Sequence, residues 1–236
     1  MFFALKYNIT INIFFLIMNK VFYWSPFTSK VATVKSVLNS AEALNKSFKK
    51  DNFKAYIIDA VHEWKAFEDE IKQKKIELIY LNKNSIFNSY IKDGFIRSRL
   101  AYWYIFFKCF FPLIKILQEQ KPNYFVIHLI SSLPLFLFIF KNFKSKLILR
   151  ISGLPKMTLL RKLLWKLASK NIYKITCPTI DTFNDLSKFE FLRKKLCVLN
   201  DPIININEIQ KSRKREVIIN KDLNHIISNK KFLLSI

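Results

Sequence analysis

Polar side chains that could bind a ligand follow several of the apolar runs in this sequence, at the points where each run ends. Most carry a hydroxyl group or a positive charge, and carboxylates are few: Ser25, Thr28, Lys30, His128, Ser131, Arg150, Ser152, Lys156, Thr179 and Asp201. Hydroxyl groups and cations suit a phosphorylated or hydroxyl-rich ligand better than they suit metal binding or carboxylate-pair chemistry. The sequence shows no Ser-His-Asp order, nucleophile elbow, metal-ligand spacing, glycine-rich phosphate loop or internal repeat.

Several of these residues also have a structural interpretation. His128 lies in an apolar run, where a histidine is either a hydrogen-bonded core residue or a catalytic group. Arg150 either contacts a ligand or pairs with a carboxylate. Ser152 and Gly153 form a turn that could touch a ligand, and Gly153 is one of only two glycines, which predicts that the backbone requires it there. His62 follows another strand end and is interpreted as a solvated loop residue.

Short apolar runs that alternate with helical patterns predict the elements that position these side chains. Strands are expected at residues 19–24, 53–58, 76–81, 124–129, 146–151, 174–177 and 195–199. This alternation predicts an α/β fold, a Rossmann-like, doubly wound, mainly parallel sheet with helices on both faces. Ligands of such sheets bind at the carboxyl ends of the strands, which is where the polar side chains lie.

Two segments show the clearest helical patterns. The aromatic segment 97–118 predicts a long helix with one core face, or alternatively a helix that lies in a membrane surface. Segment 159–167 predicts an amphipathic helix in which Leu164 and Trp165 pack in the core. Its apolar face consists of leucines and its other face is basic: Leu159, Leu160, Leu163, Leu164 and Leu167 against Arg161, Lys162 and Lys166. A further helix is expected at 179–189, with Thr179 near its start.

The composition gives a core and a strong positive charge. The chain has 236 residues, 51% of them hydrophobic, and a net charge of +23. That charge indicates a polyanionic partner such as nucleic acid, an anionic membrane or a phosphorylated ligand, or else a compositional drift, since lysine, asparagine, isoleucine and phenylalanine are all abundant while glycine is scarce. No nucleic-acid recognition motif is present and the charge is spread along the whole chain, which argues against nucleic acid. Cys109, Cys177 and Cys197 lack metal-ligand spacing and suit a reducing compartment.

Two apolar segments raise the question of a membrane. Residues 1–17 are interpreted as an apolar extension upstream of a start at Met18, or as a weak membrane anchor. Residues 124–140 carry no formal charge, which reaches the lower length limit of a transmembrane helix. Because His128, Ser131 and Pro134 interrupt this segment, it is expected to form a buried strand followed by a buried helix. A non-catalytic membrane-associated protein remains the alternative function.

Four short motifs occur in a characteristic order: NKVFYWSP at 19–26, RISGLP at 150–155, ITCPT at 175–179 and LNDPI at 199–203. Together they resemble the N-terminal domain of GT-B-fold glycosyltransferases of the family 4 type. The final KFLLSI, at 231–236, is similar to the opening strand of the second domain of that family. The resemblance therefore implies residues 1–17 as an extension, 18–204 as the N-terminal domain, 205–230 as a basic linker and 231–236 as the start of a truncated donor domain.

The resemblance implies a function. In that family the N-terminal domain binds the acceptor and the C-terminal domain binds the nucleotide-sugar, and the sugar is transferred with retention of configuration, without a bound cofactor or an obligatory metal. The implied acceptor is a glycan or a lipid-linked molecule of cell-envelope polysaccharide or lipopolysaccharide synthesis. The implied location is the cytoplasm at the inner face of the plasma membrane, where residues 97–115 would contact anionic lipid. Without the donor domain, the chain is expected to be inactive alone.

The same resemblance assigns roles to individual residues. The loop with Ser25, Thr28 and Lys30 would lie under the donor phosphates or the acceptor, although it lacks the glycine pair usual in the family. His128 would point into the cleft as the catalytic group. The remaining implied substrate-binding residues are Ser131, Arg150, Ser152, Gly153, Lys156 and Thr179. No metal site is implied.

Overall fold

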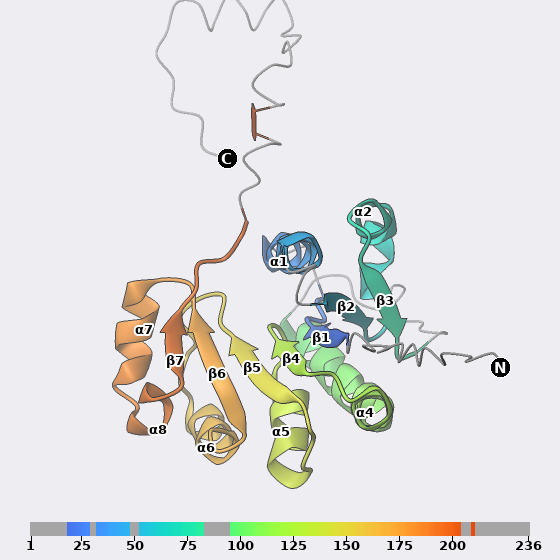
Figure 1. Cartoon of the computed structure of the whole chain (residues 1–236). Coiled ribbons are helices and arrows are strands. Elements are labelled where there is room, and N and C mark those ends of the chain that lie inside the picture. Colours follow the sequence, from blue (N-terminus) through green and yellow to red (C-terminus); the bar gives the residue numbers. More distant parts are fainter. Residues whose placement is uncertain (1–17, 29–31, 48–51, 83–94, 204–208, 211–236) are drawn as a thin grey trace, which may run out of the picture. The chain divides into compact units, whose positions relative to one another are not determined.

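The computed structural model describes residues 18–28, 32–47, 52–82, 95–203 and 209–210, and within them lies a seven-stranded sheet in which every pairing is parallel (Figure 1). The strand order is β3-β2-β1-β4-β5-β6-β7. The strands are β1 (Asn19–Trp24), β2 (Phe53–Asp59), β3 (Glu77–Tyr80), β4 (Tyr124–Ile127), β5 (Lys146–Arg150), β6 (Ile172–Cys177) and β7 (Leu196–Val198).

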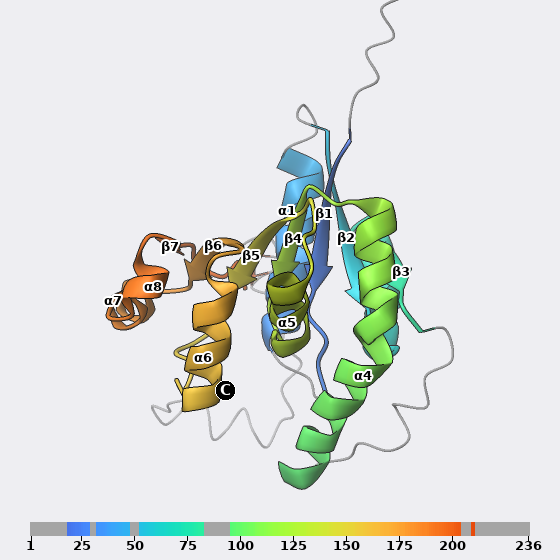
Figure 2. The ribbon, with the colours of Figure 1, turned by 90° about the horizontal axis from the view of Figure 1, so that it is seen from below.

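Helices cover both faces of the sheet. They are α1 (Ala32–Ser47), the 3₁₀ helix η1 (Glu63–Phe67), α2 (Glu68–Gln73), α4 (Phe95–Gln120), α5 (Ser132–Phe140), α6 (Leu159–Ala168), α7 (Ile180–Ser187) and α8 (Glu190–Arg193). Figure 1 shows α1 and α2 on one face and α4, α5 and α6 on the other, with α7 and α8 beside β7. Figure 2 shows α4, α5 and α6 side by side. This arrangement confirms the predicted α/β fold class with helices on both faces.

Strand β1 contributes to two separate hydrophobic cores. Phe22 and Trp24 belong to the larger core under α4, α5 and α6, whereas Val21 and Tyr23 belong to the core under α1 and α2. Successive side chains of a strand point to opposite faces, so a strand covered on both faces must be apolar at nearly every position. This explains why β1 reads as a continuous apolar run in the sequence.

The predicted strands are all present, with ends that differ by a few residues. Residues 124–140 form β4 and α5, as the strand-and-helix interpretation predicts, and most of α5 is buried. Strand β4 ends at Ile127, two residues earlier than expected, and the backbone turns through a left-handed Ile130 with φ 45°. Strand β6 begins at Ile172, two residues earlier than expected. Several predicted segments lie outside the described residues: residues 1–17, Lys30, residues 231–236 and all of the basic linker except residues 209 and 210.

Helix α4 has the core face that its pattern predicts. Its buried positions recur every four residues, at Ala101, Ile105, Cys109, Leu113 and Leu117. Among the described residues, the segment Arg99–Gln120 of this helix is the one that is long and apolar enough to cross a membrane. In its most apolar stretch of 18 residues, 33% is buried. The helix therefore packs on the sheet with one side and leaves the other side open.

Helix α6 departs from the expectation for an amphipathic helix. Trp165 is buried and Leu164 packs against the core, as predicted. The leucine face is nevertheless exposed, because the side toward the sheet is made by Trp165 and Ala168: the exposed residues are Leu159, Leu160, Leu163 and Leu167. The apolar face of this helix is thus directed away from the core.

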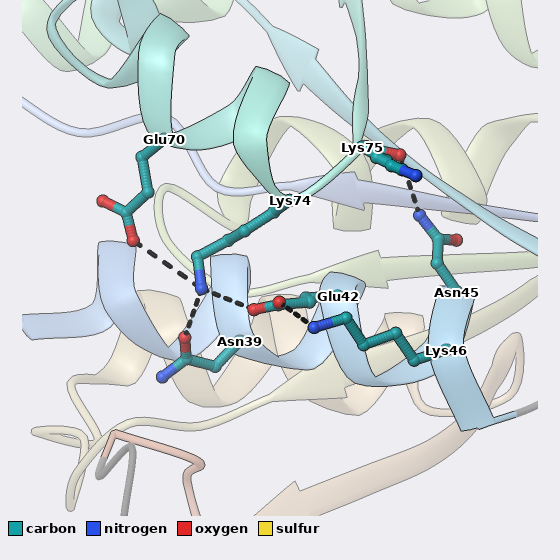
Figure 3. Close-up of polar contacts among 7 residues, drawn as sticks. All are labelled: Asn39, Glu42, Asn45, Lys46, Glu70, Lys74 and Lys75. Atoms are coloured by element: carbon teal, nitrogen blue, oxygen red, sulfur yellow. Dashed lines mark hydrogen bonds and ion pairs between the residues drawn. The ribbon is translucent and has the colours of Figure 1, made fainter. Parts of the chain in front are cut away.

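A buried lysine joins α2 to α1 (Figure 3). The Lys74 ammonium group donates to the Glu42 carboxylate at 2.5 Å and to the Asn39 side-chain oxygen at 3.2 Å, and Glu70 lies 3.9 Å away. Only 7% of the Lys74 side chain is exposed. Glu42 also accepts from the exposed Lys46 at 2.5 Å. A buried ammonium group needs these partners, since desolvated charge is costly when it is unpaired.

We expect Glu42→Gln to lower the free energy of unfolding by about 2 kcal/mol, because it removes the charged partner of the buried Lys74. The matched control is Lys46→Gln, which breaks the exposed pair on the same carboxylate and should cost about 0.5 kcal/mol or less. Urea denaturation followed by circular dichroism measures both. Equal losses in the two variants would show that the buried position of Lys74 does not matter.

Candidate functional site

The strand order reverses at β1 and β4, which are neighbours in the sheet although α1 to α4 separate them in the sequence. In open parallel sheets, ligands bind outside the carboxyl ends of the strands at such a reversal. Two hydrogen bonds join the loops here. The His128 N–H donates to the Trp24 carbonyl oxygen at 2.9 Å, and the Trp24 indole N–H donates to the Ile130 carbonyl oxygen at 3.1 Å. Trp24 is fully buried, so it fixes both loops to the edge of the sheet.

A pocket of about 460 Å³ opens at this edge. The β1–α1 loop, the β4–α5 loop, α4 and α6 line it with Pro26, Phe27, Thr28, Tyr102, Leu129, Ile130, Ser131, Ser132, Leu160, Arg161, Leu164 and Trp165. The lining combines the hydroxyl groups of Thr28, Ser131, Ser132 and Tyr102 and one guanidinium group with aromatic and aliphatic walls. Such a mixture, apolar walls with a few convergent polar groups, is typical of small-molecule sites.

Two features of the pocket favour an anionic or hydroxyl-rich ligand. The Arg161 guanidinium group donates to the Lys156 carbonyl oxygen at 2.7 Å, which orients the arginine without neutralising its charge. Helix α5 begins at Ser132, and the side chain of its N-cap residue, Ser131, makes no capping hydrogen bond. The N–H groups of the first turn of a helix favour anions, and here Ser131 does not occupy them.

Arg150 lies in a second polar cluster behind this edge. Its guanidinium group forms an ion pair with Asp201 at 2.8 and 2.9 Å and donates to the Ser40 hydroxyl at 3.2 Å. The Tyr23 hydroxyl lies 3.1 Å from the same Ser40 oxygen. Only 5% of the Arg150 side chain and 9% of the Asp201 side chain are exposed. Arg150 therefore connects β5 to α1 and to the segment after β7, and its side chain borders a second cavity, of about 300 Å³, on the α1 face of the sheet.

His128 is buried near Arg150 and Asp201. Within the part of the chain that the structure describes, neither of its ring nitrogens has a hydrogen-bond partner. Burial and, to a smaller degree, the nearby Arg150 charge together lower the pKa of His128 to about 4, against a smaller opposing effect of Asp201. The imidazole is consequently neutral at physiological pH. The hydroxyl groups of Ser25 and Thr176 are also buried and without a partner among the described residues.

The structure brings together only part of the predicted site. Thr28 and Ser131 line the pocket, whereas Ser25 and His128 are buried and do not line it. The predicted residues Ser152, Gly153 and Lys156 are exposed on the β5–α6 loop and do not line the pocket. Thr179 caps α7, where its hydroxyl oxygen accepts from the Thr182 N–H at 3.2 Å. Lys30 lies outside the described residues.

The expectation for Gly153 is wrong. A Cβ atom at this position would meet nothing within 4 Å, and the backbone does not adopt a left-handed conformation there. Neither of the physical reasons that require a glycine, a close approach or a positive φ, is therefore present. The scarcity of glycine in the chain is no guide to a backbone requirement at this turn.

Sequence reasoning missed Arg161, Ser132, Tyr102 and a buried carboxyl pair. Arg161 was visible only as one of the basic residues of α6, and nothing in the spacing showed that it reaches the pocket. The pair consists of Asp59, at the end of β2, and Glu63, whose carboxylate accepts from the Ala60 and Val61 N–H groups at 3.1 and 2.7 Å. Burial, followed by the Asp59 charge, raises the pKa of Glu63 well above its usual range. Neither carboxyl lines the pocket.

The described residues contain no group of three or more histidine, cysteine, aspartate or glutamate side chains that could hold a metal ion. The pocket itself contains no carboxylate or imidazole among its described lining residues. Its chemistry is therefore that of binding and orientation, through hydroxyl groups, a guanidinium group and aromatic rings.

Comparison with solved structures places this architecture. The chain is similar to the UDP-GlcNAc 2-epimerase from Neisseria meningitidis bound to UDP-GlcNAc, with 14% identity, a TM-score of 0.55 and coverage of 83% of this chain and 50% of that chain. It is also similar to the glycosyltransferase from Rickettsia africae, with 13% identity, a TM-score of 0.52 and coverage of 83% and 48%. The Staphylococcus aureus MnaA–UDP complex is similar as well, with 12% identity, a TM-score of 0.51 and coverage of 77% of this chain and 43% of that chain.

The chain has the fold of one half of a GT-B protein. It spans about half the length of the solved structures that it matches. No protein-family profile and no curated protein matches the sequence. At these identities the similarity shows the fold alone, which the epimerases and the glycosyltransferases among these structures share. The expectation of one half of a GT-B fold is confirmed at the level of the fold.

We expect the stability of the protein to fall by about 3 kcal/mol between pH 6.5 and pH 4 through His128 alone. The unfolded chain binds a proton at His128 near pH 6.5, while the folded chain resists protonation until about pH 4, so lower pH favours unfolding. His128→Leu should remove this part of the pH dependence. Thr176→Val, a substitution at a buried position that does not titrate, should leave this pH dependence unchanged. Urea denaturation at several pH values tests this, and an unchanged slope in His128→Leu would contradict it.

Proposed function

We propose that this chain forms the acceptor-binding half of a retaining glycosyltransferase, which moves a sugar from a nucleotide-sugar to a glycan or lipid-linked acceptor of the cell envelope. The observation that carries the proposal is the pocket at the β1–β4 edge, with Thr28, Ser131, Ser132 and Arg161 on its wall. The half-GT-B fold supports it. The nucleotide-sugar is a donor substrate in this proposal, and no metal or bound cofactor takes part.

Each group of the pocket has a role that suits a phosphorylated sugar. The hydroxyl groups of Thr28, Ser131 and Ser132 can donate to and accept from sugar hydroxyls. Arg161 can pair with a phosphate oxygen through two parallel N–H groups, the geometry that guanidinium groups favour. The rings of Tyr102 and Trp165 offer apolar surfaces for the carbon faces of a sugar. Phosphate at the start of α5 would also meet the N–H groups that Ser131 leaves uncapped.

The composition of the pocket favours transfer over epimerisation. Inversion at a carbon atom that bears hydrogen requires groups that remove and return a substituent or proton there. The described residues of the lining provide no carboxylate or imidazole for this, and the buried Asp59–Glu63 pair lies elsewhere. A pocket that only holds and orients an acceptor hydroxyl fits a transferase whose remaining chemistry is supplied from the donor side of the cleft.

We predict that Arg161→Ala raises the Kd for N-acetylglucosamine 1-phosphate by about tenfold, since it removes a charge-assisted pair with the phosphate. For N-acetylglucosamine, which lacks the phosphate, the Kd should rise less than twofold in the same variant. The matched control is Lys166→Ala, an exposed cation on the same helix that does not line the pocket. Protein NMR shifts during a ligand titration measure each Kd. An equal loss in both variants, or for both ligands, would contradict the assignment of Arg161.

A second measurement separates the two enzyme classes. The protein is incubated with UDP-GlcNAc in deuterated water, and the hydrogen at carbon 2 of the sugar is followed by proton NMR. We expect no loss of this signal, because the pocket has no group to exchange the hydrogen. Loss of the signal, with appearance of the epimer, would overturn the transferase proposal in favour of an epimerase.

A further inference from the structure

A continuous apolar surface covers the outer side of α4, α5 and α6, here called the α4–α6 apolar face. Its members are exposed aromatic and leucine side chains: Leu100, Trp103, Tyr104, Phe107, Phe111, Phe136, Phe140, Leu159, Leu160, Leu163 and Leu167. Leu159 is 87% exposed, Phe111 76% and Phe107 67%. Soluble proteins rarely expose so many large apolar side chains together, and such patches mark interaction sites.

Ring contacts make the part of this face on α4 and α5 continuous. The Trp103 ring stacks on Phe107, with centroids 5.7 Å apart. Phe106 meets the edge of Phe136 at 5.8 Å, and Phe136 lies 4.7 Å from Phe140. Helices α5 and α6 then lie next to each other on the same side of the sheet (Figure 2). The three helices therefore present one surface rather than three separate patches.

The charges on the three helices of this face are almost all positive. Residues 95–168, which span all three helices, contain one of the 17 carboxylates of the chain, Glu119, near the end of α4. Exposed cations occur on each helix or directly after it: Arg99, Lys108, Lys115, Lys141, Arg161, Lys162 and Lys166. An apolar surface surrounded by cations and nearly free of carboxylates is complementary to an anionic, apolar partner.

We propose that the α4–α6 apolar face binds the surface of an anionic lipid bilayer, with the leucines and rings among the acyl chains and the lysine and arginine groups at the lipid phosphates. Helix α6 has the composition of a helix that lies in the interface plane, with leucines on one side and Arg161, Lys162 and Lys166 on the other. Trp103, Tyr102 and Tyr104 on α4 are exposed and suit a position at the lipid–water boundary, where tryptophan and tyrosine rings concentrate.

A protein partner fits this face less well. Lysine is depleted in protein–protein interfaces, whereas Lys162 and Lys166 lie on the same helix as the exposed leucines of α6 and border their side. Helix α4 is apolar enough to span a bilayer, yet its Ala101, Ile105 and Leu113 side is buried against the sheet, so the helix lies along the domain and offers only its outer side. This geometry matches contact with a membrane surface rather than insertion across it.

The pocket opens between α4 and α6, because Tyr102 and Leu160 belong to its lining. If the sugar-acceptor role holds, a lipid-linked acceptor would pass from the bilayer into the pocket without leaving the membrane surface. The membrane proposal itself stands on the apolar face and its charges alone, and it does not need that role.

Co-sedimentation with lipid vesicles tests the proposal. The probes are phosphatidylcholine vesicles with and without about one third phosphatidylglycerol. The test variant is Leu159→Gln with Leu163→Gln, two exposed leucines that do not line the pocket. The matched control is Ile180→Gln with Val198→Gln, two exposed apolar residues on α7 and β7. Circular dichroism and thermal melts verify that both double variants fold as the parent chain does.

We expect binding to the anionic vesicles to be at least tenfold tighter than to the neutral ones, and to weaken as salt increases. The α6 variant should lose at least tenfold in affinity for the anionic vesicles, and the control variant should lose less than twofold. Equal binding to both vesicle types, or equal losses in the two variants, would overturn the proposal. The proposal would also be overturned if the parent chain did not bind vesicles but formed a concentration-dependent dimer that the α6 variant abolished. In that case the face would contact a second copy of the chain. The Kd for N-acetylglucosamine 1-phosphate, measured on the same variants, reports the pocket separately.

Discussion

The parallel pairing of β1 with both β2 and β4 is the constraint on which the rest of the structure depends. Parallel neighbours cannot be joined by a tight turn, so each connection must cross a face of the sheet. Because the strand order reverses at β1 and such crossovers share one hand, the helices before and after the reversal cover opposite faces. Because β1 lies between the two halves of the sheet, its side chains must supply both cores. The same pairing brings the β1 and β4 loops together, and the Trp24 hydrogen bonds hold them there. The pocket is a consequence of this strand order.

The fold could be predicted from the sequence because buried parallel strands leave a direct trace. A strand covered on both faces is apolar at successive positions, and β1, β4 and β5 all read this way. The segment 124–140 could be assigned to a strand and a helix for a related reason. His128 and Ser131 interrupt an otherwise charge-free run at the point where the chain leaves the sheet, and Ile130 turns there with a positive φ.

The site was harder to predict because it depends on which side of an element faces inward. Periodicity shows that the α6 leucines share a face, but it gives no orientation relative to the sheet. Trp165 buries more surface than a leucine and occupies the inward side, which turns the leucines outward and brings Arg161 to the pocket. Likewise, Asp59 ends β2 and Glu63 begins η1 four residues later, and only the three-dimensional structure shows that both are buried.

The distribution of charge bears on whether the strong basicity of the chain is compositional or functional. A general compositional drift toward lysine, asparagine, isoleucine and phenylalanine would add cations and apolar side chains over the whole surface. The carboxylates, however, are concentrated elsewhere: Glu42 and Glu70 pair with Lys74, and Asp201 pairs with Arg150. Around α4, α5 and α6, the near absence of carboxylates coincides with exposed rings and leucines. Such a drift would not gather exposed apolar side chains and exclude carboxylates on one face, so the coincidence of the two features there favours a selected surface.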